Sequence, residues 1–228
     1  MITPINMNLL LSYSRFVLCT LIVLTLTGFD PVHATVTGQI IKYQTPDGVI
    51  LADADVDWSS YTKVQLERGT VEFRENWARD QQQINNNVIR EADLVRIKTD
   101  MSDLLEKVLT RKLSDTEGYT LISESGADVL RFTPRIEKLD IYAPDRTRNF
   151  VGHVLTDSQG SMVLVLDISD SVSGKLLASA VQKQVDRERG YMEITSSGTN
   201  RTAFRQMMDR WATWLLELFD EVRAGTLH

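Results

Sequence analysis

The chain has almost no cysteine. Cys19 is its only one, and it lies inside an apolar run near the amino terminus. We expect that run to be removed on export, which leaves a mature chain without a thiol. Structural disulfides, thiol catalysis and cysteine-ligated metals are then excluded. The mature domain must be held together by its core, for which 43% hydrophobic residues are adequate.

Histidine and the familiar catalytic motifs are also scarce. His33 precedes the predicted mature domain and His228 ends the chain, so His153 is the only histidine in the body of the domain. One histidine cannot form a zinc site without cysteine partners. The sequence contains no Gly-x-Ser-x-Gly elbow, P-loop or His-Glu-x-x-His motif. We therefore assign no catalytic residue, no metal ligand and no cofactor.

An excess of basic residues is missing as well. The net charge is -6 and the pI is about 5.2. Removing residues 1–34 takes away one Arg and one Asp, so this balance does not change. An acidic domain without a basic tract is a poor ligand for nucleic acid and for anionic membrane surfaces.

The amino terminus has the pattern of a secretory signal. Arg15 precedes an apolar run from Phe16 to Leu26, and Val32-His33-Ala34 provides a cleavage site. We predict a signal peptide over residues 1–34, cleaved after Ala34, and a periplasmic or secreted product without stable membrane insertion. An uncleaved inner-membrane anchor is the alternative, but a span of about 20 residues would bury Arg15. Translation from Met7 instead of Met1 stays open.

The remainder divides into a flexible segment and one domain. Residues 35–57 are polar and turn-rich, and we predict a flexible mature N-terminal segment there. Residues 58–224 are predicted to form a single domain. Alternation and helical periodicity predict strands at 61–67, 119–123, 129–142, 162–168 and 176–187, and helices at 92–113 and from about 200 onward. A bulge is expected near Glu137, and Pro134 favours an edge strand or an irregularity.

This order of elements predicts the fold class. Hairpin-spaced strands beside long one-sided helices indicate an α+β two-layer sandwich. We expect a mostly antiparallel sheet with two long amphipathic helices packed on one face. The run at 162–168 is almost entirely apolar, so it is predicted to be a central strand covered on both faces.

Two partial motifs are better explained by local structure. Asp53, Asp55 and Asp57 have the spacing that opens a calcium loop, but the glycine and glutamate that should follow are absent. We expect a solvated acidic turn. Ser60 and Lys63 have Ser-x-x-Lys spacing, but the accompanying elements of those enzymes are missing and Ser60 would enter a strand.

A binding role is most favoured for residues 143–160. This segment contains Arg146, Arg148 and His153, and Arg135 lies on the predicted strand before it. In an acidic protein, such a local excess of positive charge can hold a carboxylate or a phosphate. The alternative is a mobile hairpin loop with its charges spread over both strand faces.

Four segments together resemble a known family. They are Val56-Asp-Trp58 with Tyr61 and Val64, then 128–145, 170–178, and Asn200-Arg201 leading to Arg210-Trp211-Ala212. In this order they are similar to a domain-of-unknown-function family of exported bacterial proteins, many of them predicted lipoproteins. The resemblance implies a cell-envelope location and no known reaction. Asp170 and Arg201 join the candidate binding residues on this ground. Cys19 lacks a lipid-attachment context, because Leu18 precedes it.

Three functional hypotheses follow. The first is a non-enzymatic binding or accessory module of the bacterial envelope, which contacts another envelope protein through a sheet face, a sheet edge or the 143–160 segment. The alternative is a hydrolase whose site assembles from scattered residues such as His153, Asp157 and Ser161. A homo-oligomeric structural component is the third.

Overall fold

The structure is a computed structural model, and it describes residues 36, 40–46, 48–85, 89–141, 155–156, 160–186, 193–194 and 197–224. Residues 34–228 belong to one compact unit. In the described part, one sheet has the strand order β1-β2-β9-β8-β6-β3-β5, and β4 also pairs with β6. The strands are β1 Ile40–Gln44, β2 Gly48–Asp53, β3 Lys63–Leu66, β4 Thr70–Phe73, β5 Thr120–Ile122, β6 Val129–Ile141, β8 Gly160–Asp170 and β9 Leu176–Val185. A separate antiparallel pair joins β7 Leu155–Thr156 to β10 Glu193–Ile194.

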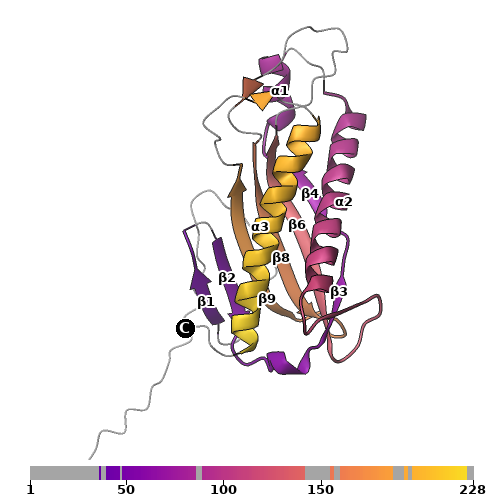
Figure 1. The fold of residues 1–228 in the computed structure, drawn as a ribbon, viewed down its shortest axis with the longest axis vertical. Helices are drawn as coiled ribbons and strands as arrows, with labels where there is room; N and C mark the ends of the chain where they lie inside the picture. The colour runs from indigo at the N-terminus through magenta and orange to yellow at the C-terminus, as the bar shows by residue number, and fades with distance from the viewer. Residues whose placement is uncertain are drawn as a thin grey trace, which may run out of the picture. The chain divides into compact units, whose positions relative to one another are not determined.

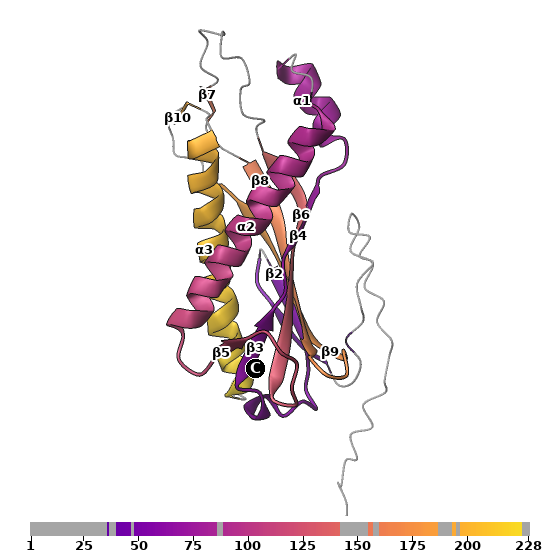
Figure 2. The same cartoon turned by 90° about the vertical axis from the view of Figure 1, so that its right-hand side faces the viewer.

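The sheet is mixed, with antiparallel pairs in the majority. Strands β1, β2, β9, β8 and β6 are joined by antiparallel pairing. Strands β3, β4 and β5 join through parallel pairing. Two long helices, α2 Glu91–Asp115 and α3 Ser197–Arg223, lie on the same face of the sheet (Figures 1 and 2). The α+β sandwich predicted from the sequence is therefore confirmed.

The helix inventory is larger than expected. A third α-helix, α1 Trp77–Asn85, and a short 3-10 helix, η1 Trp58–Ser60, accompany α2 and α3 in the described residues. Strand β4 and helix α1 lie between the predicted strand at 61–67 and the predicted helix at 92–113, where no element was predicted. Trp77 anchors α1, since its side chain is 1% exposed and its Nε1 donates to the carbonyl of Ile141 at 2.8 Å.

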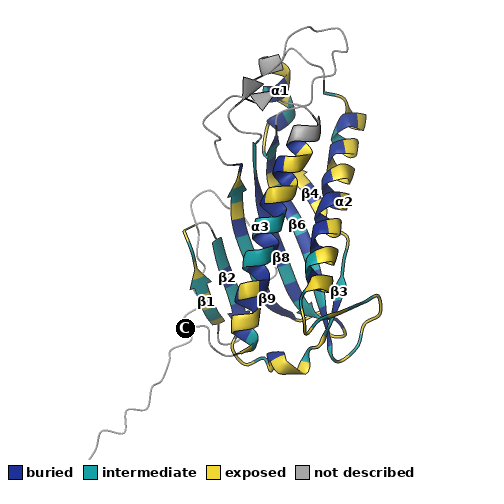
Figure 3. Ribbon diagram, in the orientation of Figure 1, coloured by how far each residue is buried: buried dark blue, intermediate teal, exposed yellow. Residues whose placement is uncertain are grey.

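The main core lies between the two long helices and the inner face of the sheet, the face that they cover. Leu105 and Leu109 of α2 and Trp211 of α3 are all at most 2% exposed. They pack in one cluster with Leu164 and Leu166 of β8. Bands of buried and exposed residues alternate along α2 and α3 (Figure 3). Burial of one apolar stripe per helix is the main stabilising contribution expected for such a layer.

Strand β6 changes its partner at Pro134. On one edge it pairs with β3 up to Phe132 and with β4 from Arg135 onward. Pro134 has no N–H to donate, and it lies between the stretch of β6 that pairs with β3 and the stretch that pairs with β4. The irregularity predicted at Pro134 is therefore confirmed, as a change of partner strand. The predicted bulge is also present, because the register with β8 shifts between Glu137 and Asp140 and Lys138 has φ 51°.

The segment expected to be a flexible lead-in contains two strands of the sheet. Residues 40–44 and 48–53 form the hairpin β1–β2, and β2 pairs with β9. Ile50 and Ala52 are buried at 5% and 1% exposure. The aspartates and the turn residues suggested a solvated segment. However, alternate side chains of β2 face the core, so Ile50 is buried between the half-buried Val49 and Leu51.

The last helix begins earlier than the predicted cap. Helix α3 starts at Ser197, so Asn200 lies inside it, with 6% exposure. Within the described residues, no helix combines the length and the apolar character needed to cross a membrane.

Candidate functional site

The outer face of the sheet, opposite α2 and α3, is the surface best suited to a binding role. Its residues alternate with the core residues along each strand. The register identifies them, and they include Gln65, Arg131, Thr133, Arg135, Glu137, Val163, Val165, Asp167, Ser179, Val181, Lys183, Val49, Leu51, Lys42 and Gln44. The β6 side of this face is charged, and the part over β8, β9 and β2 is rich in valine.

Arg135 lies in the charged half and is held by two carboxylates. Its Nη1 donates to Asp167 Oδ2 at 2.6 Å, and its Nε approaches Glu137 Oε1 at 3.4 Å. Ser179 donates to the other oxygen of Asp167 at 2.7 Å. Burial lowers the pKa of Arg135, but the hydrogen bond from Arg135 to Asp167 and the charges of Asp167 and Glu137 outweigh it, so the pKa is raised.

A second cluster surrounds Arg131, which lies four residues before Arg135 in β6. Its Nη2 donates to the carbonyl of Ser171 at 2.6 Å, and its Nε lies 3.5 Å from Glu67 Oε1. Thr133 donates to the second oxygen of Glu67 at 2.8 Å. The side chains of Arg131 and Glu67 are 30% and 42% exposed, so water and a partner can both reach this cluster. Both arginines are therefore matched by carboxylates, which argues against a vacant anion pocket around them.

The valine half of the outer face is largely buried. Val163 and Val165 of β8 are 4% and 0% exposed, although α2 and α3 lie on the opposite side (Figure 2). Val181 pairs with Val165, and Val49 pairs with Val181 in the next strand. Both are half-buried. An apolar row thus crosses three strands beside the charged half, and the two halves meet where Arg135 neighbours Val165.

Asp170 lies at the end of β8 and organises a turn. Ser173 donates to Asp170 Oδ1 through its backbone N–H at 2.6 Å and through its hydroxyl at 2.7 Å. Tyr61 donates to Oδ2 at 3.1 Å. The hydrogen bonds from Ser173 lower the pKa of Asp170, and burial together with Asp170 raises the pKa of Tyr61. These contacts give Asp170 a structural role in the turn before β9.

Three of the four family-like segments meet around this turn. Tyr61 reaches Asp170, and Thr62 and Lys63 donate backbone N–H groups to the carbonyl of Asp128 at 3.1 and 3.2 Å. The hydroxyl of Ser171 donates to the carbonyl of Gly126 at 3.0 Å. The family-like segments thus meet at one end of the sheet, where these hydrogen bonds connect the loops.

The acidic turn is only partly solvated. Asp53 is fully buried, and Lys175 donates to its Oδ2 at 2.7 Å. The backbone N–H of Asp55 donates to its other oxygen. Burial raises the pKa of Asp53, but the hydrogen bonds from Lys175 and Asp55 outweigh this, so the pKa is lowered overall. The expectation that the whole cluster is solvated is therefore incorrect for Asp53.

The Ser60–Lys63 pair does not form a catalytic dyad. The hydroxyl of Ser60 donates to the carbonyl of Asp57 at 2.7 Å. Lys63 Nζ lies 2.9 Å from the carboxylate of Asp128. Each side chain is thus engaged with a different partner. In the described part of the chain, no group of three or more His, Cys, Asp or Glu side chains could hold a metal ion.

The predicted site residues are not gathered in one place. Arg146, Arg148 and His153 lie outside the described residues. Arg201 is exposed near the start of α3, on the helix layer, whereas Arg135 is on the outer face. Asp170 lies at the end of β8. The structure does not bring Arg135, Asp170 and Arg201 into one site.

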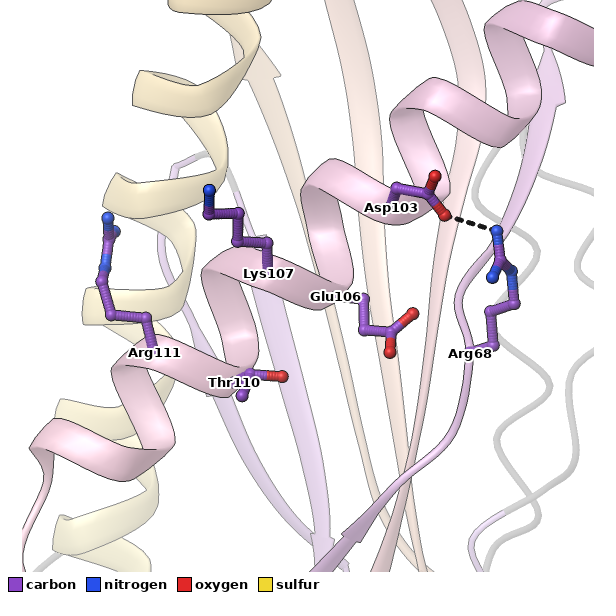
Figure 4. A pocket seen from close by; sticks show the side chains of 6 residues that line it. All are labelled: Arg68, Asp103, Glu106, Lys107, Thr110 and Arg111. Carbon is purple, nitrogen blue, oxygen red and sulfur yellow. Dashed lines mark hydrogen bonds and ion pairs between the residues drawn. The ribbon is translucent and has the colours of Figure 1, made fainter.

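A shallow depression lies along α2. It has a volume of about 580 Å³ and is lined by Arg68, Asp103, Glu106, Lys107, Thr110 and Arg111. Arg68 pairs with Asp103, whereas the other side chains point in different directions along the helix (Figure 4). Arg111 also pairs with Asp209 of α3. No described polar groups converge there as a ligand site requires.

Sequence reasoning missed most of the outer-face residues. Asp167, Ser179 and Glu67 received no role, although they are the partners of the two arginines. A usable signal was present in β6, where Arg131, Thr133, Arg135 and Glu137 alternate with apolar residues. Period-two alternation in a strand marks one polar face.

Several solved structures are similar to the chain at low identity. A DUF330 protein from Xanthomonas campestris, XCC0632, is 14% identical, with 68% of this chain and 81% of that one covered and a TM-score of 0.37. The PelC dodecamer from Paraburkholderia phytofirmans is 8% identical, with 72% and 93% covered and a TM-score of 0.34. A neuraminyllactose-binding hemagglutinin homolog from Helicobacter pylori is 16% identical, with 73% and 85% covered and a TM-score of 0.32.

The family assignment rests on the sequence itself. No curated protein matches the chain. The family described as Protein of unknown function (DUF3313) matches residues 44–215, which include every strand of the sheet from β2 to β9 and most of α3. This confirms the resemblance to a family without an assigned function. The chain belongs to the DUF3313 family of proteins of unknown function.

Proposed function

We propose that the mature chain is a non-enzymatic binding or accessory module of the bacterial cell envelope, which contacts another envelope protein through the outer face of its sheet. The observation that carries this proposal is the make-up of that face. A valine row over β8, β9 and β2 lies beside a charged half in which Arg131 and Arg135 are matched by carboxylates. Such a surface suits a protein partner.

The internal pairing of charges favours a macromolecule over a small anion. A small carboxylate or phosphate needs cationic groups that are available to it. Here, Arg135 is already engaged by Asp167 and Glu137. A protein surface can instead cover the half-buried Val49 and Val181 and add hydrogen bonds to Arg131 and Glu67, in the manner of an apolar interface core with a polar rim.

The envelope location rests on the predicted leader. Arg15, the apolar run 16–26 and the Val32-His33-Ala34 cleavage site support export, and Leu18 before Cys19 argues against lipid attachment. Intact mass measurement of the exported chain tests this part. We expect an N-terminus at Thr35 and no acyl chain. A retained leader or an acylated cysteine contradicts it.

Site-specific photo-cross-linking in the envelope tests the binding surface. A photoreactive residue at Lys183, which lies on the outer face opposite Val163, should capture a partner. The same residue at Lys107, on the exposed side of α2, is the control. We expect a discrete product from position 183 alone, abolished by Val181→Arg and retained with Val95→Arg.

Three results would count against the outer face. They are equal capture at positions 183 and 107, no product at either position, and a product with twice the mass of the chain, which would show self-association. The hydrolase hypothesis depends on His153 and Asp157, which lie outside the described residues, so no described contact favours it.

A further inference from the structure

Strand β1 is an edge strand, and among the described strands only β2 pairs with it, on one side. Figure 1 shows it as the outermost strand, next to β2. Three of its five residues are exposed, among them Ile40 at 49%. Edge strands are usually protected by proline, bulges or several charges. Lys42 is the only charged residue of β1.

The register identifies which backbone groups point outward. Thr45 and Gly48 donate to each other across the hairpin, at 2.8 and 3.4 Å. Hydrogen-bonded and non-hydrogen-bonded pairs alternate in an antiparallel ladder. Tyr43 and Ile41 therefore bond to β2, through their pairs with Ile50 and Ala52. The N–H and C=O groups of Ile40, Lys42 and Gln44 point away from the sheet.

We propose that β1 pairs with β1 of a second copy of this chain, antiparallel and about a twofold axis at Tyr43. In this register Lys42 of each copy faces Gln44 of the other, and their outward N–H and C=O groups form the hydrogen bonds. Tyr43 faces Tyr43 in a non-hydrogen-bonded pair. Ile40 faces Pro46, which is also exposed.

Charge and side-chain type favour this register over the neighbouring one. Moving the axis by one residue toward the amino terminus places Lys42 opposite Lys42, and directly opposed like charges destabilise a strand pair. The proposed register opposes no charges, joins two aromatic rings and covers the exposed Ile40. Cross-strand aromatic pairs are among the stabilising ones. The result is one continuous sheet through both copies, with their helices on the same side.

A second copy fits this edge because the edge is complementary to itself. Each strand offers, at Lys42 and Gln44, the outward groups that the other requires, and an isologous twofold contact needs that property. The contact uses the edge of the sheet and leaves the charged half and the valine row of the outer face uncovered. The proposal is therefore independent of the binding role proposed for that face.

Cysteine cross-linking tests the register directly. In the full chain with Cys19→Ser, Tyr43→Cys introduces a single thiol. Non-hydrogen-bonded pairs lie about 4.5 Å apart at Cα, within the range of a disulfide. We expect Tyr43→Cys to form a disulfide-linked dimer on mild oxidation. Ile41→Cys should not, because the two copies of residue 41 are offset by four positions, or about 13 Å.

Equilibrium sedimentation tests the association without a covalent bond. We expect a concentration-dependent dimer that is weakened about threefold to tenfold by Gln44→Lys, which opposes two pairs of like charges, and tightened by Gln44→Glu. Lys42→Pro removes an outward N–H that the chain's own sheet does not use, so it should abolish the dimer. Far-UV circular dichroism checks that the monomer keeps its fold.

Several results would overturn the proposal. A monomer at every concentration that the chain tolerates excludes self-association. A dimer whose affinity is the same in Gln44→Lys and Gln44→Glu excludes this contact. Efficient cross-linking of Ile41→Cys excludes the register. Capture of an unrelated extended peptide by β1, with no self-association, shows that the edge serves another partner.

Discussion

The two faces of the same strands are buried in different ways. Along β8, Leu164 and Leu166 point to the helices, whereas Val165 and Asp167 point to the outer face. The inner residues join an apolar cluster that is continuous with α2 and α3. The outer face combines an equally buried valine with an ion pair between Asp167 and Arg135. The inner face has the composition of a core, and the outer face has that of an interface.

The difference implies that the two faces respond differently to substitution. Residues on the inner face can change little in volume without leaving a cavity. The polar side chains on the outer face, such as Arg135 and Asp167, depend on cross-strand partners. The predictions below test whether the two faces differ energetically as the packing indicates.

The largest loss of stability is expected on the inner face. Trp211 is fully buried, and Trp211→Ala should lower the free energy of unfolding by about 3–5 kcal/mol. Urea denaturation followed by circular dichroism measures it. In the described structure the indole N–H of Trp211 has no acceptor, so Trp211→Phe should cost clearly less. A loss below about 1 kcal/mol for the alanine variant contradicts a continuous core.

A smaller loss is expected at the ion pair of the outer face. Arg135→Ala removes the cation that faces Asp167 and Glu137 and should cost about 2 kcal/mol, because Asp167 is only 15% exposed. The double variant Arg135→Met/Asp167→Leu should lose less than the sum of the single changes, since no unpaired carboxylate remains at position 167. Strict additivity would show that this pair is not coupled.

Substitution of Val165 tests whether the apolar part of the outer face is buried. Val165→Thr keeps the shape but buries a hydroxyl, and we expect a loss of about 1–2 kcal/mol. Val95 of α2 is 56% exposed, so Val95→Thr should stay within about 0.5 kcal/mol of the original chain. Equal effects at the two positions would mean that Val165 is accessible in solution.

The smallest effect is expected in the dependence of folding stability on pH. The lowered pKa of Asp53 implies a contribution to stability that is present above its unfolded value of 3.8 and lost as the pH falls through the folded value. Lys175→Met removes the main group that lowers this pKa, so the loss should begin at higher pH. Thermal unfolding between about pH 5 and pH 2 measures the shift. Lys107→Met, at an exposed lysine of α2, is the control. Identical profiles for the Lys175→Met variant and the original chain would contradict this role.

Much of the inner face could be predicted from the sequence. The apolar run of β8 and the stripes of α2 and α3 follow from periodicity alone, because burial of a whole face repeats at a fixed interval. Strand β6 and its bulge near Glu137 were predictable for the same reason. The hairpin β1–β2 was not, since its aspartates and turn residues outweighed a short alternating run. Helix α1 was missed because Trp77 is its only strong apolar signal.

The outer face was harder to predict because its contacts depend on register. Arg135 was a candidate for a free cationic site, yet its partner Asp167 lies 32 residues away and faces it only through the pairing of β6 with β8. A shift of one residue in that pairing would have turned Asp167 to the other side of the sheet. Sequence periodicity shows which side chains share a face, whereas the identity of neighbours requires the alignment of strands.

The change of partner at Pro134 also restricts how the chain can vary in length. Strands β3 and β4 are two halves of one edge, joined by residues 67–69, and both are aligned on β6. Adding or removing a single residue in this linker would shift β4 by one position and turn Val71 outward. Insertions are usually tolerated in loops, but here the connection acts as a spacer of defined length. Homologous chains should therefore conserve the length of this short stretch more strictly than its residue types.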